Sequence, residues 1–209
     1  MNNLYKKLSI ILIFFINVCL CQWQSDSLQF NLNENDSIVF YTFPKQLHFY
    51  ARDIENNDCT IDIIGEKFGS SNDILIEIYR DSELFFDDII SNSNFSLSIN
   101  IDAGLYLYDL IIYSDNGSNQ WQQLHEAENI VCGDAYLIQG QSNAAAGAEW
   151  YPQFDSNELV NPFIRSYGKP IWHYPNQLNN TDFAIAVADS IGTLGFVGVW
   201  GLGLASQII

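Results

Sequence analysis

The sequence predicts an N-terminal all-β antiparallel sandwich followed by an incomplete α/β domain. Short β-branched and aromatic runs recur through the first 125 residues, and turn-forming residues separate them. A longer apolar run at 129–138 leads into a glycine-containing turn, as a strand buried on both faces would. No helical period precedes this run, whereas small, helix-compatible residues follow it.

Length and charge limit the class of protein. The 209 residues suffice for one large or two small domains, and the hydrophobic content of 48% excludes a disordered chain. The net charge of −17 disfavours nucleic acid and anionic membranes as partners. A neutral polysaccharide carries no such penalty, although the acidity can also serve solubility alone.

Residues 1–21 predict a secretory signal peptide. Two lysines precede an apolar run at 8–20, which is too short for a stable membrane span. We expect cleavage near Cys21, secretion or export to the periplasm, and no membrane attachment afterwards. A lipid anchor on Cys21 would need a small residue before it, and Leu20 stands there instead.

Two cysteines, Cys59 and Cys132, remain after the predicted cleavage. An oxidising compartment would allow them to pair. Each also lies in an apolar, strand-like context, in which an unpaired cysteine behaves as a small hydrophobic residue. The sequence leaves both readings open.

Residues 22–125 form the predicted sandwich module. Regular spacing of seven or eight short strands, with turn residues such as those at 65–71 between them, is typical of antiparallel sandwiches. The candidate strands are 37–43, 46–50, 59–63, 74–79, 84–86, 95–99, 105–113 and 121–125.

Residues 126–209 form the predicted second domain. After the run at 129–138 we expect a short strand near 163–167, a helix or strand at 183–188, and a loop feeding a helix at 198–209. These elements cannot close a parallel sheet, and the chain ends on two apolar isoleucines without a helix cap. We therefore interpret the sequence as an N-terminal fragment of a longer protein.

The turn Gly140-Gln141-Ser142-Asn143 is the leading candidate for a functional site. A serine between a buried strand and a helix presents its hydroxyl at the carboxyl end of the strand, where open α/β sheets bind ligands. From the residues alone, an ordinary turn serine is the alternative, because Gly-x-Ser is common.

Residues 133–143, Gly-Asp-Ala-Tyr-Leu-Ile-Gln-Gly-Gln-Ser-Asn, resemble the first conserved block of the sialate O-acetylesterase group of SGNH hydrolases. Residues 198–201, Gly-Val-Trp-Gly, with Leu-Ala at 204–205 resemble a second block of that group, where a helix begins. Residues 49–53 are similar, less specifically, to an early strand of the sandwich that often precedes the esterase domain. The pair Ala144-Ala145 departs from the family pattern on the substrate side.

The resemblance implies a flavodoxin-like α/β/α hydrolase domain and a secreted carbohydrate O-acetylesterase. Ser142 would be the nucleophile, and its backbone N–H would be an oxyanion donor. Gly140 would permit the tight turn, and Gln141 and Asn143 would brace it on the substrate side. The substrate would be an acetylated carbohydrate, either a sialic acid or a plant polysaccharide.

The catalytic histidine and aspartate of the family lie in a later Asp-x-x-His block, which we expect beyond residue 209. His48, His125 and His173 do not occur in such an arrangement, so we expect the 209-residue chain to be inactive by itself. The alternative function is a carbohydrate-binding or adhesive β module joined to a degenerate esterase segment.

No metal or cofactor is predicted. The acidic residues between 53 and 62 lack the spacing and the turn glycine of a calcium loop, so we interpret them as a solvated edge. The chain also lacks the Cys/His spacing of zinc sites and the glycine-rich phosphate loop.

Overall fold

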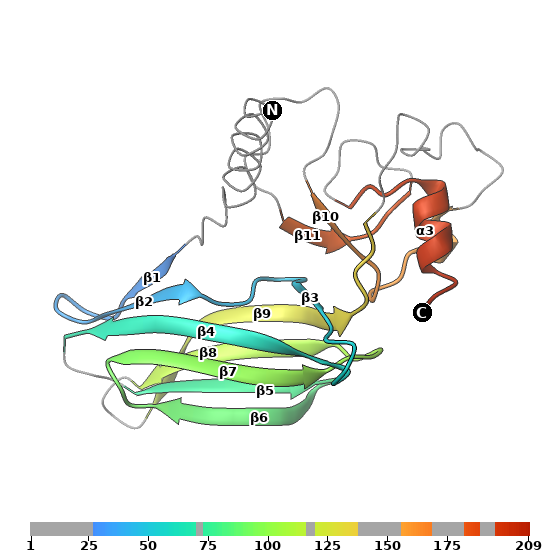
Figure 1. Ribbon diagram of the computed structural model, residues 1–209. Coiled ribbons are helices and arrows are strands. Elements are labelled where there is room, and N and C mark those ends of the chain that lie inside the picture. Colours follow the sequence, from blue (N-terminus) through green and yellow to red (C-terminus); the bar gives the residue numbers. More distant parts are fainter. Residues whose placement is uncertain (1–26, 70–72, 116–119, 138–155, 169–181, 189–194) are drawn as a thin grey trace, which may run out of the picture.

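The computed structural model describes residues 27–69, 73–115, 120–137, 156–168, 182–188 and 195–209 (Figure 1). The predicted signal peptide, residues 1–21, lies outside them, and so does the turn at 140–143. Among the residues that the structure describes, no helix is long and apolar enough to cross a lipid bilayer.

Nine strands form two sheets. One sheet has the order β1-β2-β4-β7, and the other has the order β3-β9-β8-β5-β6. Neighbours run antiparallel except for β3 and β9, which run parallel. The strands are β1 (Leu28–Asn31), β2 (Ser37–Thr42), β3 (Phe49–Ala51), β4 (Asp58–Phe68), β5 (Ile74–Arg80), β6 (Glu83–Ile90), β7 (Asn94–Asp102), β8 (Tyr108–Asp115) and β9 (Trp121–Gly133).

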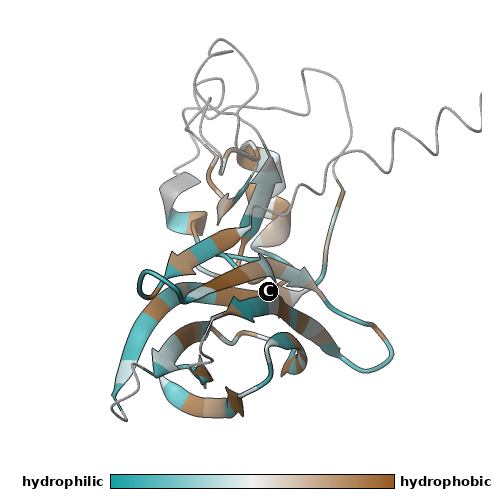
Figure 2. Ribbon diagram, turned by 90° about the vertical axis from the view of Figure 1, so that its left-hand side faces the viewer, coloured by the Kyte–Doolittle hydropathy of each residue, from teal (hydrophilic) through white to brown (hydrophobic). Residues whose placement is uncertain are grey.

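The two sheets pack face to face around a single apolar core. Alternation of buried and exposed side chains along β4 and β8 places every second residue in this core, as period-2 geometry requires. Ile61 and Ile63 from the first sheet and Ile76 and Leu110 from the second are fully buried in it. The same alternation is visible as bands of hydropathy along the strands (Figure 2). This is the antiparallel β-sandwich that the sequence predicts.

The turn expected at 65–71 starts later than predicted, because β4 continues to Phe68. A Cβ atom at Gly65 would lie 2.4 Å from the carbonyl oxygen of Val39 and 2.5 Å from the Phe95 ring. Gly65 therefore serves a close approach inside the sheet and does not mark the turn.

The expected domain boundary between residues 125 and 126 falls inside β9, so the sandwich extends to Gly133. At Asn129 the strand adopts a positive φ of 58°, and the backbone N–H of Asn129 donates to Asp109 Oδ1 at 2.8 Å. The strand passes through this irregularity without ending. Ile130 and Cys132 then complete the sandwich core, so the apolar run belongs to this sandwich.

The described part of the chain after Gly133 forms a small unit beside the end of β9 (Figure 1). It contains the antiparallel pair β10 (Arg165–Gly168) and β11 (Asp182–Ile185), the 3₁₀ helix η2 (Ser156–Leu159) and the helix α3 (Val199–Ala205). Its own apolar cluster comprises Ile164, Ala186, Ala188, Val199 and Leu202.

The predictions for this region are met in part. The short strand near 163–167 and the helix after Gly198 are present, and the segment left open as helix or strand begins as strand β11. An α/β/α hydrolase domain is not found within the residues described, where β10 and β11 pair antiparallel.

Candidate functional site

The four residues predicted to form the catalytic turn, Gly140, Gln141, Ser142 and Asn143, lie outside the described residues, and so does His173. The described structure reaches Leu137, a few residues upstream of the turn. The geometry around the end of β9 is therefore the part of the candidate site that the structure defines.

An ion pair joins two of the three segments that resemble the esterase family, residues 49–53 and residues 133–143. Parallel pairing of β3 and β9 sets Ala51 opposite Gly133, so the residues that follow, Arg52 and Asp134, lie next to each other. Arg52 Nε donates to Asp134 Oδ1 at 2.6 Å, and Arg52 Nη2 donates to Asp134 Oδ2 at 3.2 Å. Such two-point pairing fixes direction as well as distance.

Further hydrogen bonds hold Arg52 in place. Its Nη1 donates to Asn57 Oδ1 at 2.6 Å, and its backbone N–H donates to the carbonyl oxygen of Gly133 at 2.9 Å. The hydrogen bond to Asp134 raises the pKa of Arg52. Because both side chains are partly exposed, solvent screens the pair, and we assign it an orienting role more than a large stabilising one.

A cleft of about 350 Å³ lies beside this ion pair. It is bounded by the end of the sandwich on one side and by the C-terminal unit on the other. The walls are mainly apolar and aromatic, with Arg52 and Arg165 as their cationic residues. The apolar and aromatic residues that line it include Phe49, Leu105, Val131, Tyr136, Phe163 and Ile164.

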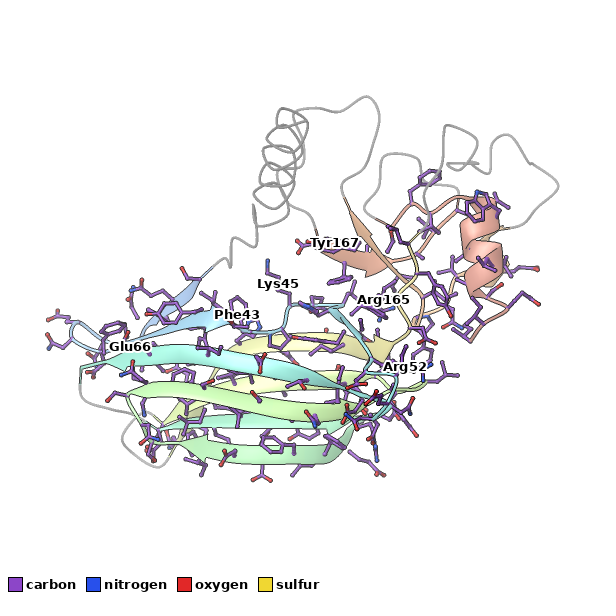
Figure 3. The ribbon with its side chains drawn as sticks, viewed as in Figure 1. Phe43, Lys45, Arg52, Glu66, Arg165 and Tyr167 are labelled. Carbon is purple, nitrogen blue, oxygen red and sulfur yellow. The ribbon has the colours of Figure 1, made fainter. Side chains whose placement is uncertain are left out.

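Arg165, at the start of β10, is the second cation of the cleft, and it lies at the same end of the sandwich as Arg52 (Figure 3). Its Nη2 donates to the carbonyl oxygen of Asn129 at 3.0 Å, and its Nη1 donates to that of Pro162. Its Nε is buried and has no hydrogen-bond partner among the described residues. Burial lowers the pKa of Arg165 to about 10. The guanidinium is therefore charged at neutral pH, and its buried Nε has no acceptor among the described residues.

The two described histidines are packed structural groups. His48 stacks on Tyr50, with ring centroids 4.4 Å apart, and its Nδ1 accepts a hydrogen bond from the backbone N–H of Lys45 at 3.4 Å. Burial, reinforced by the charge of Lys45, lowers the pKa of His48 to about 4. A histidine of such low pKa is a poor general base at neutral pH.

His125 is also packed and hydrogen-bonded, but its partners differ from those of His48. Its Nε2 lies 3.1 Å from the carbonyl oxygen of Pro44, so this nitrogen carries the hydrogen and donates it. Its ring makes an edge-to-face contact with Phe43. Burial lowers the pKa of His125. Neither His48 nor His125 lines the cleft.

The acidic run between residues 53 and 62 stabilises a local turn. Asp53 Oδ1 accepts a hydrogen bond from the backbone N–H of Glu55 at 2.8 Å, and Asp53 Oδ2 accepts one from Asn56 Nδ2 at 3.1 Å. Within the described ranges, no three His, Cys, Asp or Glu side chains gather as metal ligands would.

The sequence does not single out Arg52 or Arg165 individually. Arg52 lies in a segment of family resemblance, but its partner Asp134 comes 82 residues later, and only the parallel pairing of β3 with β9 joins them. No sequence pattern points to Arg165, because its contact with Asn129 depends on the fold.

Comparison of the chain with protein-family models gives no match, and comparison with curated proteins gives none either.

Proposed function

We propose that this chain belongs to an exported carbohydrate O-acetylesterase of the SGNH class, with Ser142 as its nucleophile. The observation that carries the proposal is the sequence of residues 133–143, which starts at the last residue of β9. The Arg52–Asp134 pair supports it, because it holds the first residues of this segment in a fixed direction.

The proposed reaction is acyl transfer in two steps. Ser142 Oγ attacks the carbonyl carbon of a sugar acetate while a histidine takes its proton. The backbone N–H of Ser142 donates to the oxyanion, and the sugar hydroxyl leaves with the proton returned by the histidine. Water then hydrolyses the acetyl-enzyme and releases acetate. Gly140 permits the tight turn, and Gln141 and Asn143 brace it.

The cleft at the end of β9 suits such a substrate. Tyr136 and Phe163 offer aromatic surface for a sugar, and Arg52 and Arg165 add cationic groups to the cleft wall. The substrate class in the proposal is a sialic acid or plant polysaccharide that carries acetyl esters. Export to the periplasm or the medium follows from the signal peptide predicted at residues 1–21.

A base for Ser142 is not supplied by the histidines that the structure describes, because His48 and His125 are both packed and have lowered pKa values. The proposal therefore assigns the base and its carboxylate to a later Asp-x-x-His block. We expect the isolated 209-residue chain to hydrolyse p-nitrophenyl acetate no faster than background, and robust turnover by it would contradict this assignment.

The test of the nucleophile is hydrolysis of p-nitrophenyl acetate by the full-length gene product. Ser142→Ala should lower kcat by at least about 10³-fold, because the residual rate then comes from binding and the oxyanion donors alone. Ser96→Ala, at an exposed position of β7, is the matched control and should leave the rate unchanged. Full activity in Ser142→Ala would show that the assignment is wrong.

A second candidate function is a carbohydrate-binding β module. It is favoured by the sandwich having a complete apolar core of its own, independent of the C-terminal cluster. Three results together would support this alternative. The chain would bind immobilised glycans, Ser142→Ala would leave that binding unchanged, and the full-length gene product would have no esterase activity.

A further inference from the structure

Two buried cysteines face each other across the sandwich. Cys59 lies near the start of β4 in the first sheet, and Cys132 lies near the end of β9 in the second. Their exposed fractions are 5% and 2%, and both belong to the central apolar core. Both thiols are free and buried in this core, and Cys132 is close enough to Cys59 to raise the pKa of its thiol.

The backbone explains why the two sheets come together at this point. Cys59 is paired with Ile101 of β7, and the chain then leaves β7 across the open end of the sandwich. The N–H of Ala103 donates to the carbonyl oxygen of Asn57 at 3.0 Å, just before β4. The N–H of Gly104 donates to the carbonyl oxygen of Cys132 at 3.3 Å. This connection therefore ties β4 to β9 at the level of the cysteines, and Cα atoms of the two strands come within 8 Å.

We propose that Cys59 and Cys132 form an intersheet disulfide when the chain folds in an oxidising environment. The oxidant is a disulfide, either that of a thiol–disulfide oxidoreductase or oxidised glutathione. The thiolate of one cysteine attacks this disulfide and forms a mixed disulfide. The thiolate of the other cysteine then attacks the protein sulfur and expels the oxidant's second thiol. Both cysteines lose a proton, and the two electrons reside on the reduced oxidant.

The timing of this reaction is set by burial. The interaction with Cys132 is the main cause that raises the pKa of the Cys59 thiol, and burial is the second cause. A buried, protonated thiol is a poor nucleophile, so the folded, reduced protein should oxidise slowly. The bridge therefore forms during folding, while small disulfides and enzymes still reach the sulfur atoms.

The bridge would stabilise the sandwich, because it closes a long loop between the first and second sheets in the unfolded chain. We expect the oxidised protein to melt on the order of 10 °C above the reduced one, given the usual effect of closing such a loop in a domain of this size.

The experiment is refolding of the unfolded, reduced chain in a buffer of oxidised and reduced glutathione, with a parallel sample in excess dithiothreitol. Peptide mapping by mass spectrometry without reduction should find the Cys59 and Cys132 peptides linked, lighter by two hydrogen atoms than the separate peptides. Peptide mapping is needed because the chain has four cysteines. A natively folded product with both residues free, or each carrying glutathione, would overturn the proposal.

Cys59→Ala and Cys132→Ala are the matched controls. Each should yield no such linked peptide and should melt at the same temperature in both buffers. If either variant fails to fold, the wild-type chain in the two buffers still decides the question. The pairing in the cell rests on the proposed export. The refolding assay measures sulfur chemistry alone, so its outcome is independent of export and of esterase activity.

Discussion

Gly65 lies within β4, where a glycine ordinarily weakens a strand because it has no side chain to pack. Here the missing side chain is the useful property. The ring of Phe95, which is paired opposite Gly65 on β7, occupies the space that a Cβ would need, and the carbonyl oxygen of Val39 also lies too close to that position. The aromatic residue thereby reaches the core contact with Phe40, at a centroid distance of 5.5 Å.

Gly65→Ala should therefore destabilise the protein by about 1–3 kcal/mol, since the ring or the strand must move to admit one methyl group. Gly203→Ala in α3 is the matched control, because nothing lies within 4 Å of a Cβ there. That change should be neutral or stabilise α3 by up to about 1 kcal/mol through helix propensity. Urea unfolding of both variants measures the difference, and equal effects would contradict this account.

His48 makes the stability of the protein dependent on pH. Its pKa falls to about 4 in the folded state, below the ordinary value of 6.5, because burial disfavours the charged ring. In the window between these values the unfolded chain binds the proton and the folded chain does not, so stability falls as pH drops from about 6.5 to about 4.

We expect the loss across this window to be roughly 2–4 kcal/mol, from the linkage between pKa and stability. His48→Phe retains the stacking on Tyr50 but cannot take up a proton, so its unfolding midpoint in urea should vary less between pH 6.5 and pH 4. An identical pH dependence in wild type and variant would show that His48 does not carry this effect.

At the scale of elements, the alternation along each strand decides which side chains matter for stability. Ile76 on β5 points into the core and is fully buried, whereas Ile89 on the adjacent strand β6 is 52% exposed. The two residues have the same side chain and lie on paired strands, so they differ mainly in the face that they occupy.

Ile76→Ala should cost about 2–5 kcal/mol, because the core cannot fill the cavity completely. Ile89→Ala should change the free energy of unfolding by no more than about 0.5 kcal/mol. Thermal or urea unfolding measures both. A large effect of Ile89→Ala would indicate that the outer face of β6 is covered by a partner.

The strand β9 is the element on which the fold and the candidate site meet. Its residues up to Ile130 pair with β8, and its last three residues pair with β3. The pairing with β3 brings Arg52 beside Asp134, in the segment that leads in sequence to residues 140–143. This contact results from the parallel register of β3 and β9. The local sequence around Arg52 or Asp134 does not produce it.

At the scale of the molecule, the extent of the sandwich can be tested by truncation. A chain of residues 27–137 contains every strand of both sheets and should unfold in one cooperative thermal transition. A chain of residues 27–125 lacks Ala127, Ile130 and Cys132 of the core and leaves β3 without its partner. It should show no cooperative transition by circular dichroism. Cooperative unfolding of the shorter chain would place the boundary near residue 125, as the sequence alone predicts.

The sequence by itself determines the alternating strands, because period 2 and β-branched residues express a local geometry. It also indicates the short strand near residue 165 and the helix after Gly198. The candidate nucleophile Ser142 rests on sequence alone, since it lies outside the described residues.

Only the tertiary structure decided three things: that β9 continues through Asn129 into the sandwich, that Arg52 meets Asp134, and that Cys59 meets Cys132. The two side-chain contacts join residues more than 70 positions apart in the sequence. The continuation of β9 depends on a bulge in its pairing with β8. Local patterns report which face of a strand is buried. They do not report which strand lies beside it, because pairing is selected by the packing of the whole core.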